Sequence, residues 1–168
     1  MPENLIFSNK EIAFLRELER QNVDFMLVDA AAAALQGAPV VTQDVDLWFE
    51  DLKNPGIQAA LRKSGGIMVP SFGQNPVTFA GDAVKLFDIV LTMPGLGSFA
   101  EEKKNSFTVR LGSVRVKVLN LDRIIASKEA IRRPKDLVVL PVLRDTLKAL
   151  RQKKLKKIEP RTSKGRKG

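Results

Sequence analysis

The stretch Phe25–Phe49 reads FMLVDAAAAALQGAPVVTQDVDLWF, and the fold of the whole chain depends on it. Its apolar start indicates a short strand, Phe25–Val28, and the alanines at 30–34 favour a helix whose small side chains can pack close to a sheet. Gly37 and the proline that follows end this helix. A second strand is then predicted over Val40–Phe49. The order strand, helix, turn, strand is typical of a domain in which helices flank a sheet.

The second predicted strand carries two carboxylates, Asp44 and Asp46. Because they are two residues apart, a strand would project both from one face while Val45 and Leu47 point to the other. Magnesium prefers hard oxygen ligands and is often held by one or two carboxylates together with substrate phosphates. The pattern is short, however, and two solvated acids on an open face would produce the same spacing.

Composition limits the chemistry that is open to the chain. It has 168 residues, enough for one domain with a sizeable core, and contains no cysteine and no histidine. Disulfides, thiolate metal sites, thiol nucleophiles and imidazole bases are therefore excluded. The apolar runs are too short to span a bilayer, and the sequence does not open on a signal peptide pattern. We expect a cytoplasmic protein with no membrane partner.

Further strands and helices are expected on both sides of this stretch. Ser8 and Glu11 form a capping-box pattern that opens a first helix. Val84–Leu91 is predicted to be a strand that carries Asp88, and Phe107–Leu111 and Val114–Leu119 a hairpin. Because hairpins interrupt the alternation of helices and strands, the fold class is α/β (α+β) with a mixed β-sheet flanked by helices.

The last third of the chain is predicted to be helical. Asn120 is a candidate cap for a helix that runs to Ile131, and Pro134 suits the first turn of another helix. An apolar stripe of leucines continues that last helix to Leu150. The interpretation divides the chain into a domain, residues 1–150, and a basic C-terminal extension, residues 151–168, that is partly disordered.

The order of these motifs resembles the nucleotidyltransferase superfamily, and most closely its small prokaryotic members, several of which belong to toxin–antitoxin and abortive-infection systems. The resemblance rests on Leu27–Gly37 and on the Thr-Gln-Asp-Val-Asp-Leu sequence that ends at Leu47. Downstream, Lys85–Leu91 resembles the family's third acid strand, and Leu121–Leu137 resembles a later helix signature. The resemblance implies a nucleotidyltransferase-like fold, an NTP substrate and a Mg²⁺ or Mn²⁺ cofactor.

The resemblance also implies roles for individual residues. Asp44, Asp46 and Asp88 would bind the metal, and Asp88 would also orient or deprotonate the attacking hydroxyl. Lys128 would contact the triphosphate, as an ammonium group can, although a solvated lysine on a helix surface is the alternative. Thr42 and Gln43 would flank the nucleotide or serve only as polar residues at the strand edge.

Other residues in these motifs have plain structural interpretations. Arg133, Lys135 and Asp136 are expected to fix a helix start through salt bridges or capping, with substrate binding as the alternative. Trp48 follows Leu47 in the acid strand, and a position in the core is favoured over a role in base stacking.

Asp29 and Ala30 depart from the family pattern, which has a glycine pair or Gly-Ser where backbone N–H groups at a helix start meet the triphosphate. An aspartate at this position is expected to cap the helix, which typically stabilises it by roughly 0.5–2 kcal/mol. Its carboxylate would also repel phosphate. Three interpretations stay open: the triphosphate pocket is lost, Asp29 disables it, or the nucleotide binds in a shifted pose.

The net charge of +9 is concentrated at the C-terminus. From Lys148 onward the chain holds ten of its 28 lysines and arginines but one of its 19 acids, so the rest is neutral. Such a segment can bind nucleic-acid phosphates without reading sequence, or can be merely solvated. The candidate contacts are Arg151, Lys153, Lys154, Lys156 and Lys157.

The preferred interpretation is a metal-dependent enzyme that moves a nucleoside monophosphate from an NTP to a hydroxyl acceptor. The acceptor is an RNA end or a protein side chain, and the basic tail favours RNA. One alternative is a catalytically inactive relative that binds nucleic acid or a protein partner, and Asp29 supports it. Another is an antitoxin-like modifier of a cognate protein toxin.

Overall fold

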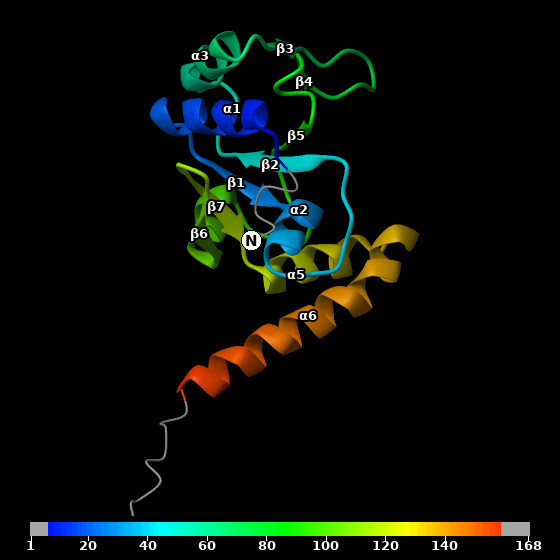
Figure 1. The fold of residues 1–168 in the computed structure, drawn as a ribbon. Helices are drawn as coiled ribbons and strands as arrows, with labels where there is room; N and C mark the ends of the chain where they lie inside the picture. The colour runs from blue at the N-terminus through cyan, green and yellow to red at the C-terminus, as the bar shows by residue number, and fades with distance from the viewer. Residues whose placement is uncertain (1–6, 159–168) are drawn as a thin grey trace, which may run out of the picture.

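A five-stranded mixed sheet forms the centre of the computed structural model, which describes residues 7–158 (Figure 1). Its strand order is β5-β2-β1-β7-β6. Strand β1 runs antiparallel to β2 and parallel to β7, whereas β2 and β5 are parallel and β6 and β7 antiparallel. The predicted mixed sheet is therefore confirmed. The strands are β1 Phe25–Val28, β2 Val45–Phe49, β5 Phe87–Val90, β6 Ser106–Leu111 and β7 Val114–Leu119.

Helices cover both faces of this sheet. Figure 1 shows α1 and α3 on one side and α2, α5 and α6 on the other. Their bounds are α1 Asn9–Arg20, α2 Asp29–Leu35, α3 Pro55–Lys63, α5 Leu121–Ile131 and α6 Pro134–Ile158. A short hairpin of β3 Ile67–Val69 and β4 Thr78–Ala80 lies beside α3, and a short α4, Phe99–Glu102, continues into the 3-10 turn η2, Lys103–Asn105.

The core lies between the sheet and its helices and fixes the position of β1 and β2. All four residues of β1 are buried, as are Val45 and Leu47 of β2. Trp48 is 1% exposed and donates a hydrogen bond from Nε1 to the Leu91 carbonyl, which confirms it as a core residue. The alanines of α2 let this helix pack closely on the sheet, because Ala31, Ala32 and Ala33 are buried.

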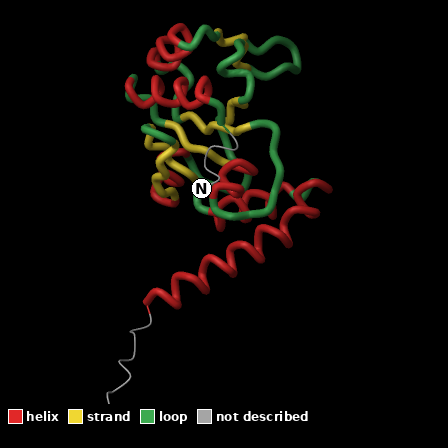
Figure 2. The backbone as a smooth tube through the Cα atoms, viewed as in Figure 1, coloured by secondary structure: helices red, strands yellow, loops and turns green. Residues whose placement is uncertain are grey.

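Two predicted strands are shorter than expected. The predicted strand Val40–Phe49 begins at Val45, because β1, its antiparallel partner, ends at Val28 opposite Asp46 and the chain there turns into α2. Residues 36–44 therefore form a long loop with no strand beside it (Figure 2). The predicted strand Val84–Leu91 is reduced to β5 because backbone bonds to Gly81 hold residues 81–86 in turns.

The helix ends follow the sequence in part. The Ser8–Glu11 capping box of α1 is formed, as predicted. Asn120 precedes α5 but makes no side-chain cap hydrogen bond; instead, the Leu121 N–H donates to Gln36 Oε1 at 2.9 Å. None of the described helices is long and apolar enough to cross a membrane.

The last helix is continuous across the predicted boundary at residue 150. Helix α6 packs on α5 through its N-terminal half, and Figure 1 shows its last turns extending away from the rest of the chain. Leu140 and Leu143 are buried, but Leu155 is 65% exposed. The predicted disordered residues beyond Pro160 lie outside the described residues, and the division into domain and extension stays a prediction.

Candidate functional site

Two of the predicted acids lie side by side at one edge of the site. Asp46 on β2 is directly opposite Asp88 on β5 in the parallel register. Paired residues of neighbouring strands project from the same face of a sheet, so both carboxylates lie on one side. Asp46 is half-buried and Asp88 is exposed. The chain therefore brings together two carboxylates that are 42 positions apart in the sequence.

The third acid, Asp44, lies in an exposed bend just before β2. The prediction that Asp44 and Asp46 share one strand face is wrong, because the strand begins only at Val45. The hydroxyl of Thr42 donates a 2.6 Å hydrogen bond to the carbonyl of Asp44 and stabilises this bend. Thr42 is half-buried and Gln43 exposed, both on the same loop.

The charges around Asp46 alter its protonation. Burial, and after it the neighbouring carboxylates of Asp29, Asp88 and Asp44, together raise the pKa of Asp46 to about 6, while Lys128 opposes them. Burial and the carboxylate of Asp44 also raise the pKa of Asp88. These acids therefore lie close enough to repel one another, and a bound cation would relieve that repulsion.

The donor types at this edge fit a magnesium ion. Asp44, Asp46 and Asp88 offer hard carboxylate oxygens, and their mutual repulsion favours a divalent cation. Among residues 7–158, however, no three His, Cys, Asp or Glu side chains are grouped closely enough to hold a metal ion together. Asp44, which lies in an exposed bend, is therefore not grouped with the other two acids as a three-ligand site in this arrangement.

Asp29 has the backbone conformation of a glycine. Its φ is +57°, in the left-handed region that non-glycine residues adopt rarely and that costs about 1 kcal/mol. The start of α2 has no side-chain cap hydrogen bond, so the expected capping role of Asp29 is wrong. Instead, its carboxylate lies 2.7 Å from the Lys128 ammonium. With this left-handed backbone, the side chain of Asp29 pairs with a lysine that is distant in the sequence rather than with the N–H groups of its own helix.

Lys128 is the central cation of a charge network that is partly buried. Its side chain is 12% exposed, so it is not a solvated surface lysine. Besides Asp29, it contacts Asp136 Oδ1 at 3.3 Å. Asp136 is 1% exposed and also accepts hydrogen bonds from the Arg133 backbone N–H and from Arg133 Nε, at 3.1 and 2.8 Å. These bonds, Arg133 foremost, lower the pKa of Asp136 to about 2.

The network lies in a pocket of 310 Å³ between α2, α5 and α6. Of the predicted site residues, Asp29, Ala30, Asp46 and Lys128 line it, whereas Thr42, Gln43, Asp44 and Asp88 do not. Arg133, Lys135 and Asp136 line it as well. The predicted structural role of Asp136 and Arg133 at the start of α6 is therefore confirmed by their hydrogen bonds, and both also face the pocket.

One wall of the pocket is apolar, and the sequence did not single it out. Val40 and Val41 come from the loop before β2, and Val139 and Leu143 from α6. Val41 is 97% exposed, so it is free to contact a ligand. The available signal was the pair of valines immediately before Thr42. Together the two walls offer charged groups on one side and an apolar surface on the other.

The predicted nucleic-acid contacts lie on the far half of α6. Arg151, Lys153, Lys154, Lys156 and Lys157 are all exposed. No ion pair among the described residues includes any of them. The helix therefore presents a row of charges that no acid of the described part of the chain neutralises.

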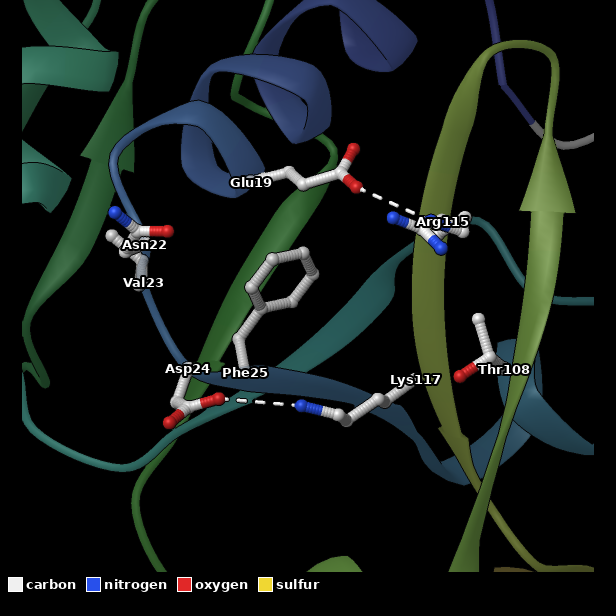
Figure 3. A pocket seen from close by; sticks show the side chains of 8 residues that line it. All are labelled: Glu19, Asn22, Val23, Asp24, Phe25, Thr108, Arg115 and Lys117. Atoms are coloured by element: carbon white, nitrogen blue, oxygen red, sulfur yellow. Dashed lines mark hydrogen bonds and ion pairs between the residues drawn. The ribbon is translucent and has the colours of Figure 1, made fainter.

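A second hollow, of 440 Å³, lies at the opposite end of β1 (Figure 3). Its charged groups are paired within the chain: Arg115 lies 3.8 Å from Glu19, and Lys117 lies 3.3 Å from Asp24. Lys103 contacts the same oxygen of Asp24 at 3.0 Å. None of the residues predicted for the site lines this hollow, so the pocket beside Asp46 is the candidate site.

Comparison with known proteins supports the fold. Neither the family models nor the curated proteins contain a match to this chain. Among solved structures, the chain is similar to ANT(2'')-Ia, an aminoglycoside nucleotidyltransferase crystallised in complex with adenylyl-2''-tobramycin. The match has a TM-score of 0.53 and 15% sequence identity, and it covers 83% of this chain and 88% of that chain. The chain therefore has a nucleotidyltransferase-like fold.

Proposed function

We propose that this protein transfers a nucleoside monophosphate from an NTP to a hydroxyl acceptor, with Mg²⁺ or Mn²⁺ held by Asp44, Asp46 and Asp88. The observation that carries the proposal is the pairing of Asp46 with Asp88 across β2 and β5 beside a pocket that contains Lys128. In a metal–triphosphate complex, the carboxylates can bind the metal ion and the neighbouring cationic group can bind the phosphates. The fold of a nucleotidyltransferase agrees with this chemistry.

Each residue has a role that follows from its surroundings. A divalent ion supplies Lewis acidity and charge neutralisation at the reacting phosphate. Asp88, the exposed member of the pair, is available to accept the proton of the attacking hydroxyl. Lys128 binds a phosphate oxygen as a point charge once Asp29 releases it. The apolar wall of the pocket, which Val40, Val41, Val139 and Leu143 form, excludes water from one side of the nucleotide.

RNA is the acceptor class that we propose. Helix α6 forms one wall of the pocket with its first half and carries the exposed cations on its second half, where they can bind RNA phosphates. A toxin–antitoxin role is the biological setting that we propose from the sequence resemblance. A protein hydroxyl, such as that of a cognate toxin, and a small-molecule hydroxyl are the competing acceptors.

A transfer assay tests the reaction and the acceptor together. The protein is incubated with each labelled NTP, Mg²⁺ or Mn²⁺, and either total RNA, total protein or an aminoglycoside. We expect label in the RNA fraction, and loss of that label in the double variant Asp44→Ala/Asp46→Ala. Asp51→Ala, which removes an exposed acid just after β2, is the matched control and should retain activity. Label that persists in the double variant would refute the assigned metal site.

A second candidate function is a non-catalytic protein of the same fold that binds nucleic acid or a protein partner. The 2.7 Å contact between Asp29 and Lys128 favours it, because the pair occupies the cation that a triphosphate needs. Calorimetry with Mg²⁺ and each NTP separates the two candidates. Heat of binding with one nucleotide supports the enzyme, and no binding with any nucleotide supports the non-catalytic protein.

A further inference from the structure

A groove of 680 Å³ continues the candidate site along α6. The pocket beside Asp46 includes Leu143 of α6, and the groove begins at Leu147, one helical turn further on the same face. On α2 the pocket likewise ends at Ala33 and the groove begins at Leu35. Pocket and groove therefore lie next to each other along α2 and α6.

The groove combines an aromatic floor with a basic rim. Phe107 of β6 lines it and is 38% exposed. Leu147 and Leu150 of α6 form its apolar side, and Arg151 and Lys154 form its rim. An aromatic ring between cations is the combination with which proteins bind single-stranded nucleic acid, because bases stack on the ring and phosphates pair with the cations.

The charge of the surroundings favours a polyanion. Between Asp145 and Glu159 every charged residue of α6 is a lysine or an arginine. The groove contains one acid, Asp122, in the first turn of α5, opposite the basic rim. The two cations of the groove therefore outnumber its one acid, and phosphates are attracted to the α6 side. This asymmetry orients a strand with its backbone along α6 and its bases towards Phe107.

We propose that this groove binds the single-stranded 3′ end of an RNA and leads its terminal hydroxyl to the acid pair. Arg151 and Lys154 bind its phosphates, Phe107 stacks on one base, and the strand continues along α6 past Leu147 towards Asp46. The position of the terminal hydroxyl rests on the proposed function, whereas binding in the groove does not.

Binding is measured without nucleotide or metal, so that it is independent of any transfer activity. A short 5′-labelled single-stranded RNA is titrated with the full chain in EDTA, and its fluorescence anisotropy is followed over a series of salt concentrations. We expect Phe107→Ala to weaken binding about ten-fold through the loss of one stacked base. We expect Arg151→Ala/Lys154→Ala to weaken binding and to flatten the log–log salt dependence by about 1.4, for two lost phosphate contacts.

Matched variants control for non-specific effects. Phe72→Ala removes an aromatic side chain that is 84% exposed on the β3–β4 hairpin, and Lys53→Ala/Lys104→Ala removes two exposed charges that lie outside α6 and outside the groove. Both should change the affinity less than three-fold, by about 0.6 kcal/mol or less. Phe107→Leu removes the aromatic ring but keeps an apolar side chain in place, so it can be measured even if Phe107→Ala is unstable. Its loss of affinity should also be about ten-fold.

The outcomes separate the groove from its alternatives. Suppose that Arg151→Ala/Lys154→Ala and the control pair of lysines weaken binding equally, and that neither Phe107 variant has an effect. Binding would then be non-specific electrostatic attraction, and the proposed groove would be wrong. Equal affinity for DNA of the same sequence, or for duplex RNA, would overturn single-stranded RNA as its occupant. A 3′-terminal photo-crosslinking base should attach to residues 38–44; attachment to residues 151–157 instead would overturn the direction of the strand.

Discussion

The ammonium of Lys128 lies 2.7 Å from the carboxylate of Asp29, and this contact links the start of α2 to the end of α5. It places a negative charge beside the cation that a triphosphate would bind, and beside Asp46, whose pKa it helps to raise. Since Lys128 also contacts the buried Asp136, it is shared between two acids. The pair therefore contributes to the charge that the pocket offers to an anion, together with Arg133 and Lys135.

Replacement of Asp29 by asparagine is expected to tighten the binding of Mg²⁺–NTP by at least ten-fold. The amide keeps the size of the side chain and tolerates a left-handed backbone, so the change removes mainly the charge. The Lys128 ammonium then loses one partner and can bind a phosphate oxygen, a charge-assisted bond that typically contributes about 1.5–3 kcal/mol. Isothermal titration calorimetry at constant Mg²⁺ measures the change.

Asp82→Asn is the control for this experiment. Asp82 is also an acid paired with lysines, Lys10 and Lys85, but it lies on the surface away from the pocket. Its replacement should leave nucleotide affinity unchanged. If Asp29→Asn behaves in the same way as Asp82→Asn, Asp29 does not limit access to the pocket.

The gain from Asp29→Asn is expected to depend on Lys128. In a Lys128→Ala background the freed cation is absent, so the second change should alter nucleotide affinity by less than three-fold. The four affinities of the double-mutant cycle give the coupling between the two residues. An equal gain with and without Lys128 would mean that Asp29 repels the nucleotide directly and that Lys128 is not its ligand.

Local patterns in the sequence were sufficient for the sheet and for part of the site. The apolar run at Phe25 and the alternation around Asp46 predict two buried strands, and the strand at Asp88 supplies the third acid. The sequence did not reveal where β2 begins, because that depends on β1 ending opposite Asp46. As a result, Asp44 was wrongly assigned to the strand although it lies in a bend.

The charge network depends on contacts between distant segments, which no local pattern contains. Asp29 is a plausible helix cap from its neighbours alone, and only the left-handed backbone and the position of α5 direct it to Lys128 instead. The apolar wall formed by Val41 and Val139 is hidden for the same reason, since α6 and the loop before β2 meet only in the folded chain.

Asp46 is expected to reduce the stability of the folded chain at neutral pH. Its pKa of about 6 in the fold exceeds the value of about 3.9 in an unfolded chain, so between these values the folded state holds an extra proton. The free energy of unfolding should therefore fall as the pH rises from 4 to 6. Asp46→Asn should remove this decrease and stabilise the chain by about 1–2 kcal/mol at pH 7.5.

Urea denaturation at pH 4.5 and pH 7.5 measures this effect. The advantage of Asp46→Asn should be large at the higher pH and small at the lower one. Addition of Mg²⁺ at pH 7.5 should stabilise the unsubstituted protein more than the variant, because the ion offsets the repulsion between Asp46 and the neighbouring carboxylates. A variant that is less stable than the unsubstituted protein at pH 7.5 would show that Asp46 is not under repulsion.

Asp136 is expected to have the opposite effect on stability. Its pKa of about 2 in the fold is below the unfolded value of about 3.9, so its contribution is fully present above pH 4 and is lost as the pH falls towards 2. Asp136→Asn should lower the free energy of unfolding at pH 7 by about 3 kcal/mol, because it leaves the buried Lys128 with one acid fewer.

Glu129→Gln is the matched control for Asp136→Asn. Glu129 pairs with Arg144 between the same two helices, α5 and α6, but it is 44% exposed, and exposed ion pairs contribute about 0–1 kcal/mol. Urea denaturation of both variants at pH 7 compares a buried and an exposed ion pair in one helix interface. If the two losses are equal, the ion pairs that Lys128 and Arg133 make with the buried Asp136 do not hold α6 against α5, and the pocket wall that α6 provides depends on its leucines instead.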